Sequence, residues 1–200
     1  MTFLPPEPHS EPLELFQAWF LAASSAGIFM PEAMTLATAS RDEGPSARLV
    51  LLKGFTPSGH LRFFTHYTSP KGQQLAADPR AALLFWWGPL ARQVRVEGEV
   101  YRLSDAESDA YFASRPRLSQ LSAAVSPQSR PISGHAELLD RADALAARLG
   151  EAPVPRPPQW GGYAVAPTRW EFWIGHDGRL HERYAYTRRG ALWDFTPLAP

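Results

Sequence analysis

Two arginines and a histidine occupy alternate positions near the end of the 200-residue chain, in the segment Arg179-Leu180-His181-Glu182-Arg183. In an extended strand, Arg179, His181 and Arg183 would point to one face, because side chains alternate across a strand. Two guanidiniums and an imidazole on one face make a poor core and favour a site for an anion or a cofactor. A solvated strand face carries the same residue types, so this segment alone leaves both interpretations open.

A second basic cluster lies far away in the sequence. It contains the segments 48–53 (RLVLLK) and 69–71 (SPK). The only two lysines of the chain are Lys53 and Lys71, and lysine is a common phosphate ligand. Ser69 stands where a helix N-cap is expected, and a lysine in the first helical turn is unfavourable unless an anion lies there. The two clusters together indicate anion binding.

The composition is that of one globular domain, with 44% hydrophobic residues that suffice for a core. The formal net charge is zero, so no overall field attracts nucleic acid or an anionic membrane, and anion binding must come from local clusters. Without cysteine, the chain has no disulfide, thiol nucleophile or iron–sulfur cluster. The six histidines show no i, i+4 pair, so we expect no metal site.

Residues 15–27 (LFQAWFLAASSAG) have the apolar character of a signal peptide. No Lys or Arg precedes Arg41, however, so the positively charged region of a signal peptide is missing. The segment is better interpreted as an amphipathic helix that Pro12 opens and Gly27 closes. Nothing approaches the roughly 18 to 20 uninterrupted apolar residues of a membrane span. We expect a cytoplasmic protein.

The rest of the chain alternates strand patterns with helical insertions. Strands are predicted at 34–39, 48–53, 61–65, 81–87, 93–101, 170–174, 182–187 and 191–195. Helices are predicted at 69–77, from a capping box at Ser104 to Phe112, within 118–133 and at 137–149, and prolines make 151–159 an extended linker. This order favours a mainly β fold with peripheral helices, a closed or nearly closed barrel. We expect an N-terminal arm and helix (1–33) and a single barrel domain (34–200).

A series of short motifs follows in one order from about residue 34 to the last residue. They are RLVLLK (48–53), FFT (63–65), SPK (69–71), DPR (78–80), RQV (92–94), YFxSRPRxSQ (111–120), SxQS (126–129), WGGY (160–163), EFW (171–173), RLHER (179–183) and LAP (198–200). Each motif is weak alone, but the ordered set resembles the FMN-dependent pyridoxine/pyridoxamine 5′-phosphate oxidases. The resemblance implies an FMN-binding split β-barrel.

The resemblance also implies roles for individual residues. The FMN phosphate and nearby ribityl oxygens would be held by Arg48, Lys71, Gln128 and Ser129. The flavin would be contacted by Phe64, Thr65, Gln93, Trp173 and Arg183. The substrate phosphate would be held by Lys53, Tyr111, Arg115 and Ser119, with Lys53 counted among the cofactor contacts as well. The catalytic pair over the pyridine ring would be Arg179 and His181.

The reaction implied is oxidation of pyridoxine 5′-phosphate and pyridoxamine 5′-phosphate to pyridoxal 5′-phosphate. Oxygen would accept the electrons and become hydrogen peroxide. The implied partners are phosphorylated vitamin B6 compounds, oxygen and a second copy of the chain, with two flavins at the subunit interface. The aromatic run Phe85-Trp86-Trp87 favours a homodimer, because we expect that the barrel cannot bury all three rings.

The chain departs from the family's residue pattern at two places, and three alternative functions remain open. Pro70 stands where the family usually has a second arginine for the FMN phosphate, and the N-terminal arm lacks the Arg-x-x-Tyr segment of some members. The alternatives are a split-barrel FMN oxidase of another aromatic compound, as in phenazine pathways, a non-catalytic flavin or pyridoxal-phosphate binder, and a structural domain. The complete set of phosphate ligands argues against the first, and Arg179 with His181 argues against the second. Flavin colour would exclude the third.

Overall fold

A computed structural model describes residues 11–200, and its regular elements follow the predicted order. The helices are α1 (Pro12–Ser25), α2 (Pro70–Ala77), α3 (Asp105–Ser114), α4 (Arg117–Val125) and α5 (His135–Leu149), with 3-10 turns η1 (Gly88–Leu90) and η2 (Asp177–Arg179). The strands are β1 (Ala33–Ser40), β2 (Gly44–Leu51), β3 (Leu61–His66), β4 (Arg80–Trp87), β5 (Arg92–Arg102), β6 (Trp160–Ile174), β7 (Glu182–Arg189) and β8 (Leu192–Leu198). The prediction of a mainly β fold with peripheral helices is confirmed.

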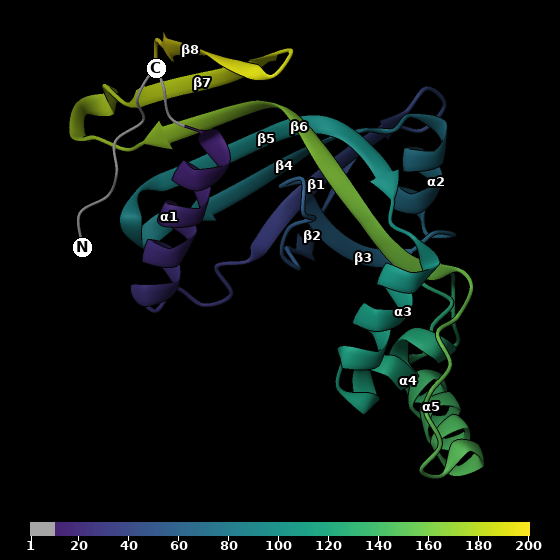
Figure 1. Cartoon of the computed structure of the whole chain (residues 1–200). Helices are drawn as coiled ribbons and strands as arrows, with labels where there is room; N and C mark the ends of the chain where they lie inside the picture. The colour runs from purple at the N-terminus through teal and green to yellow at the C-terminus, as the bar shows by residue number, and fades with distance from the viewer. Residues whose placement is uncertain (1–10) are drawn as a thin grey trace.

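The strands form one antiparallel sheet with the order β2-β1-β4-β5-β6-β7-β8, and β3 pairs with β6. The chain just beyond β2 then returns to β3, because the Lys53 amide donates to the Arg62 carbonyl (2.8 Å) and the Arg62 amide donates to the Gly54 carbonyl (2.9 Å). These bonds connect the two ends of the path β2-β1-β4-β5-β6-β3 into a barrel. Strands β7 and β8 extend the sheet beyond it (Figure 1).

Strand β6 is much longer than the strand predicted at 170–174. Its first half, from Trp160 to Val165, pairs with β3, and its second half pairs with β7, while β5 runs beside both halves. The glycines at its start explain the missed half, since they weaken a strand pattern. At Gly161 a Cβ atom would lie 2.0 Å from the hydroxyl oxygen of Tyr67, so only glycine allows this close approach.

The main core lies inside the barrel and under α1. Alternate residues of β4, such as Leu83, Phe85 and Trp87, point into it and are almost fully buried. Helix α1 closes it with Phe16 and Trp19, which are also fully buried. Burial of one such aromatic side chain contributes about 1.5 to 3 kcal/mol relative to leaving it exposed.

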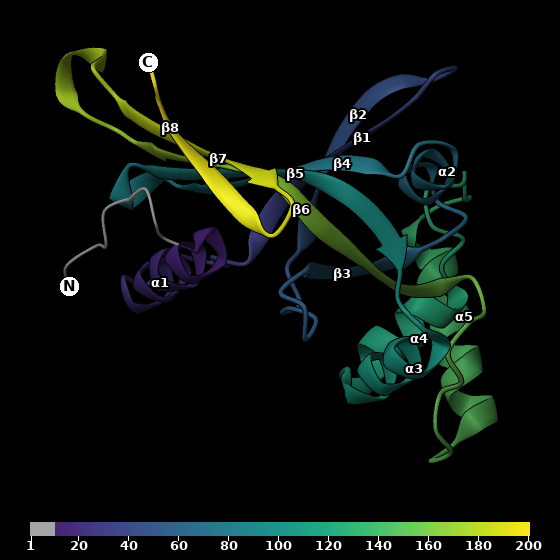
Figure 2. The ribbon, with the colours of Figure 1, turned by 45° about the horizontal axis from the view of Figure 1, so that its top comes forward.

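A smaller core holds α3, α4 and α5 together beyond one end of the sheet, while the β7–β8 hairpin lies at the other end (Figure 2). The capping box at Ser104 is confirmed, since its hydroxyl accepts from the Glu107 amide and the Glu107 carboxylate accepts from the Ser104 amide. Arg156, in the proline-rich stretch after α5, is paired with Asp105 and Asp109 of α3. Arg156 also donates to the Trp160 carbonyl (2.7 Å), so it links α3 to the start of β6.

No helix within residues 11–200 is long and apolar enough to cross a membrane. The same residues contain no group of three or more His, Asp or Glu side chains arranged to hold a metal ion.

Candidate active site

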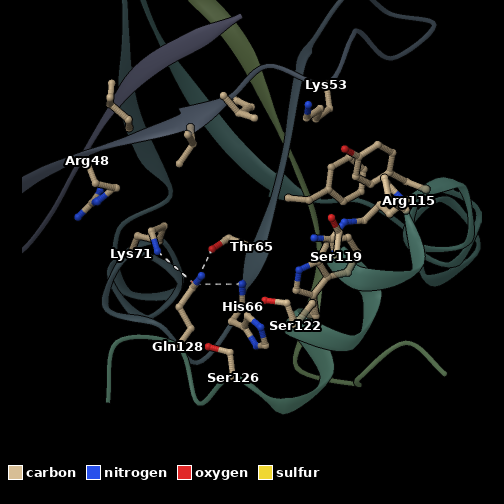
Figure 3. Close-up of a pocket in the computed structure, with 18 residues that line it drawn as sticks. Arg48, Lys53, Thr65, His66, Lys71, Arg115, Ser119, Ser122, Ser126 and Gln128 are labelled. Atoms are coloured by element: carbon tan, nitrogen blue, oxygen red, sulfur yellow. Dashed lines mark hydrogen bonds between the residues drawn. The ribbon is translucent and has the colours of Figure 1, made fainter. Parts of the chain in front are cut away.

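A cavity of about 510 Å³ opens between β2, β3, the start of α2 and the α3–α4 corner (Figure 3). Nine of the fifteen predicted site residues line it: Arg48, Lys53, Phe64, Thr65, Lys71, Tyr111, Arg115, Ser119 and Gln128. Four of the nine are Lys or Arg, and within residues 11–200 no Asp or Glu lines the cavity. A pocket with this charge pattern is suited to an anion such as a phosphate.

Arg48 extends from β2 toward the neighbouring strand β1. Its Nη1 donates to the Leu36 carbonyl (3.1 Å) and to the Thr38 hydroxyl (2.7 Å), and its Nη2 donates to Ser46. All these acceptors are neutral, so the positive charge has no direct carboxylate partner among them. Partial burial lowers the pKa of Arg48, which means that removing its charge from water is not fully compensated.

Lys71 lies in the first turn of α2, where its charge opposes the positive end of the helix. The Ser69 hydroxyl is the N-cap and accepts from the Gly72 amide, as predicted. The ammonium of Lys71 donates to the amide oxygen of Gln128 (3.3 Å), which also accepts from the Thr65 hydroxyl (2.9 Å). Burial and the charge of Arg48 lower the pKa of Lys71, so an anion would relieve an unfavourable concentration of positive charge.

Arg115 ends helix α3 and stacks over Trp160, with the guanidinium carbon 4.8 Å from the ring centroid. Its Nη1 is buried and has no hydrogen-bond partner within the described residues. Beside it, the Tyr111 ring stacks on Phe64 at 3.8 Å between centroids. A buried guanidinium donor without an acceptor is expensive, and a phosphate oxygen is an acceptor of the right kind. The residues of the cavity therefore fit a phosphate-bearing ligand.

The other six predicted residues do not line this cavity: Gln93, Ser129, Trp173, Arg179, His181 and Arg183. Ser129 follows Gln128 directly, with a left-handed backbone (φ 66°). Gln93, Trp173 and Arg183 are cross-strand neighbours on β5, β6 and β7, so the fold brings them together in a second group. The guanidinium of Arg183 is fixed there by the carboxylate of Glu171 (2.8–2.9 Å).

The prediction that Arg179, His181 and Arg183 share one strand face is wrong. Strand β7 begins only at Glu182, and the preceding residues form the turn that connects it to β6. Gly178 (φ 72°) and Arg179 (φ 63°) are both left-handed, and two such residues in succession reverse the chain rather than extend it. The roles of Arg179 and His181 remain predictions.

His181 nevertheless lies beside the second group. Its ring is 4.6 Å from that of Trp173, and its Nδ1 accepts a hydrogen bond from the His176 amide (3.1 Å). Glu182, the first residue of β7, connects the turn to the strand, since its carboxylate contacts His176 and the Tyr184 hydroxyl (both 2.5 Å). The turn therefore holds His181 against the sheet without belonging to a strand.

Sequence reasoning gave no role to His66, which also lines the cavity. It follows Thr65 at the end of β3 and is 3% exposed. Ser122 and Ser126 were missed as well, although Ser122 follows Ser119 at the i+3 position of α4 and Ser126 caps the end of that helix. Two features of the sequence could have predicted these cavity residues. One is the spacing of the serines after Ser119, and the other is the position of His66 between the predicted flavin contact Thr65 and the SPK motif.

Comparisons with known proteins agree over nearly the whole chain. Residues 22–150 match the family model "Pyridoxamine 5'-phosphate oxidase", and residues 160–200 match "Pyridoxine 5'-phosphate oxidase C-terminal dimerisation region". The pyridoxine/pyridoxamine 5'-phosphate oxidase of Rubrobacter xylanophilus is 52% identical over 190 residues, which cover 95% of this chain and 87% of the relative. That of Bordetella petrii is 50% identical over 200 residues, which cover 100% and 94%.

Two solved structures share the fold. PhzG from Burkholderia lata, in complex with tetrahydrophenazine-1-carboxylic acid, has a TM-score of 0.91 and 32% identity and covers 98% of each chain. A pyridoxamine 5'-phosphate oxidase-related, FMN binding protein from Nostoc punctiforme has a TM-score of 0.78 and 17% identity, with 96% and 99% covered. The second likeness concerns the fold alone.

The antiparallel barrel, its peripheral helices and these neighbours define the class as the split-barrel proteins. Within that class, the chain belongs to the pyridoxamine 5'-phosphate oxidase family and is an oxidoreductase.

Proposed function

We propose that the protein is an FMN-dependent oxidase that converts pyridoxine 5′-phosphate and pyridoxamine 5′-phosphate to pyridoxal 5′-phosphate. The observation that carries this proposal is the cavity, which is lined by four Lys and Arg side chains and has in its wall the buried Nη1 of Arg115, for which the described residues offer no hydrogen-bond partner. Two phosphates, one on FMN and one on the substrate, need two sets of cations. Arg48 with Lys71 and Lys53 with Arg115 supply them.

The substrate phosphate is assigned to Lys53, Tyr111, Arg115 and Ser119. The planar guanidinium of Arg115 is suited to two parallel bonds to phosphate oxygens, and its stacking on Trp160 limits its freedom before the ligand arrives. A fixed phosphate holds the rest of the substrate at a constant distance and orientation, which lowers the entropic part of the barrier.

The chemistry that FMN would supply in this site is two-electron redox chemistry, with a hydride taken from the C4′ carbon and two electrons passed on to oxygen. The alcohol then gives the aldehyde directly, with loss of one further proton. The amine takes up one water and releases ammonia, and in both cases oxygen becomes hydrogen peroxide. Arg179 and His181 are assigned to orient the pyridine ring and to favour the deprotonated alcohol or amine.

The active unit is proposed to be a homodimer, because the predicted flavin contacts Gln93, Trp173 and Arg183 lie outside the cavity of their own chain. A second chain would supply this group to the flavin. The match of residues 160–200 to a dimerisation region supports this, since Trp173 and Arg183 belong to that segment.

The direct test is incubation of the purified protein with added FMN and either phosphorylated substrate. We expect equal amounts of aldehyde and hydrogen peroxide. Absence of both products from both substrates, in protein that binds FMN, would overturn the assignment of the substrate.

A second candidate function is oxidation of a tricyclic aromatic acid, which the similarity to PhzG favours. Such a substrate has a carboxylate and no phosphate. Competition separates the candidates, because inorganic phosphate should inhibit the vitamin reaction by occupying Arg115 and should leave oxidation of a dihydrophenazine carboxylate nearly unchanged.

A further inference from the structure

His66 is a buried imidazole in the wall of the cavity that none of the assigned roles uses. Its carbonyl accepts from the Ser69 hydroxyl (2.7 Å), and its amide lies 3.4 Å from the side-chain oxygen of Gln128. Ser69 caps the helix that carries Lys71, and Gln128 is bonded to Lys71. The backbone of His66 is therefore fixed to the same elements that fix the ammonium of Lys71 (Figure 3).

Within residues 11–200, the two charged groups that act on His66 are both positive. Lys71 approaches from α2 and Arg115 from the end of α3, while α4 contributes the Ala123 backbone and the neutral hydroxyls of Ser122 and Ser126. Burial and the two cations lower the pKa of His66, and the hydrogen bond to the Ala123 backbone only partly offsets them. Without an anion, the ring is therefore neutral at neutral pH.

In the neutral ring only one nitrogen carries hydrogen, and the hydrogen bond to the Ala123 backbone uses it as the donor. The other nitrogen then presents a lone pair, which repels a phosphate oxygen. Protonation converts that lone pair into an N–H donor and adds a positive charge. A phosphate dianion in the cavity would supply the opposite charge that favours this protonated form.

We propose that His66 is an additional ligand of the FMN phosphate, and that it takes up one proton when FMN binds. This inference rests on the proposed function, since FMN is the assumed ligand. The FMN phosphate is favoured over the substrate phosphate because His66 shares Ser69 and Gln128 with Lys71, whereas none of these hydrogen bonds involves Arg115. Pro70 adds no cation to the phosphate corner, the part of the cavity formed by Lys71 and Gln128. A proton on His66 would supply a further positive charge there, and only when the ligand is present.

The test is titration of the apo-protein with FMN, followed by quenching of flavin fluorescence, at about pH 6 and about pH 8, on either side of the ordinary imidazole pKa of about 6.5. Wild type is compared with His66→Asn and with His66→Gln, each of which keeps an amide donor but cannot titrate. His60→Asn is the matched control, because His60 bonds to Tyr101 and does not line the cavity. The phosphate of free FMN titrates in the same range, and this contribution is common to the titrations of all four proteins.

We expect the wild type and His60→Asn to lose affinity between the two pH values by at least about threefold more than the His66 variants, since only they lose a charge-assisted bond. Calorimetry in two buffers of different ionisation enthalpy should show greater proton uptake on FMN binding by wild type than by either His66 variant. Equal pH dependence and equal proton uptake in all four proteins would overturn the inference and leave the proposed function intact. Failure of wild type to bind FMN at either pH would overturn both.

A pH-dependent difference confined to KM for the substrate, with FMN affinity unaffected, would contradict the assignment to the FMN phosphate. His66 would then belong to the substrate phosphate with Arg115.

Discussion

The ammonium of Lys71 lies 3.3 Å from the side-chain oxygen of Gln128, a residue 57 positions later in the chain. The same oxygen accepts from Thr65 at the end of β3. One amide thus joins the barrel, the first turn of α2 and the loop after α4 before any ligand is present. Because these side chains are already ordered, binding of a phosphate would cost less conformational entropy than it would at a flexible site.

Replacement of Arg115 by Ala should raise KM for the phosphorylated substrates. The half-buried guanidinium of Arg115 is assigned a charge-assisted bond worth about 1.5 to 3 kcal/mol, so KM should rise on the order of tenfold or more. FMN affinity should hardly change. Steady-state kinetics with added FMN measures this, and Arg141→Ala on the surface of α5 is the control. Loss of FMN with an unchanged KM would place Arg115 at the other phosphate.

Arg179→Ala and His181→Ala should each lower turnover while the protein remains yellow. The reason is the position of the connecting turn, which holds His181 against Trp173, and not a shared strand face. Neither residue is assigned to the FMN phosphate, so the flavin content should stay at the wild-type level. Turnover numbers and the absorbance ratio of flavin to protein measure the two effects. Wild-type turnover in both variants would remove the pair from the active site.

The sequence predicted most of the elements because their signals are local. A short run of apolar residues marks β4, and the capping box marks the start of α3. The turn at Arg179 was missed because two successive left-handed residues depend on how β6 and β7 are joined, and an arginine gives no sign of a positive φ. His66 was missed because its burial beside Lys71 and the Ala123 backbone depends on the packing of α2 and α4, which its place in the sequence only hints at.

The order of the motifs along the chain was sufficient to predict residues that line the cavity. It did not show that the predicted site residues form two separate groups in one chain. The barrel does not bury all three rings of the aromatic run, as expected: Phe85 and Trp87 are buried in the core, whereas Trp86 is 56% exposed. The separation of Gln93, Trp173 and Arg183 from the cavity depends on the length of β6, which the sequence pattern underestimated. That length sets how far the second group lies from the first.

Trp86→Glu should weaken the proposed dimer. Trp86 is the exposed member of its aromatic run, and its ring is 5.8 Å from that of Trp173, a residue of the dimerisation region. A carboxylate at this position would cost desolvation if the face is covered by a second chain. Sedimentation velocity measures the association, with Tyr101→Glu, another exposed aromatic position, as the control. A wild-type monomer that still retains FMN would contradict the dimer itself.

The apo-protein should lose stability as the pH falls below about 6.5, the ordinary pKa of an imidazole. The pKa of His66 is lower in the folded protein, so the unfolded chain binds the proton more readily in this range, and protonation favours unfolding. The loss should continue down to the folded-state pKa and then level off. Thermal melting of wild type and His66→Asn should show the variant gaining relative to wild type as the pH falls from about 8 to about 5.5. A constant difference in Tm between the two proteins would mean that His66 titrates alike in both states.

Pro70→Arg should tighten FMN binding. Pro70 is exposed at the first position of α2, where it suits the helix but offers neither a charge nor an amide hydrogen to the phosphate corner. An arginine there would stand beside Lys71 and add at most one charge-assisted bond, about 1.5 to 3 kcal/mol. The measurement is an FMN titration of both apo-proteins by fluorescence quenching, with Pro70→Gln as the uncharged control. Turnover at saturating FMN should stay nearly constant, because the phosphate is remote from the reacting end of the flavin. Equal or weaker affinity in the arginine variant would mean that the corner already has its full complement of donors, with a protonated His66 in the place that the arginine would take.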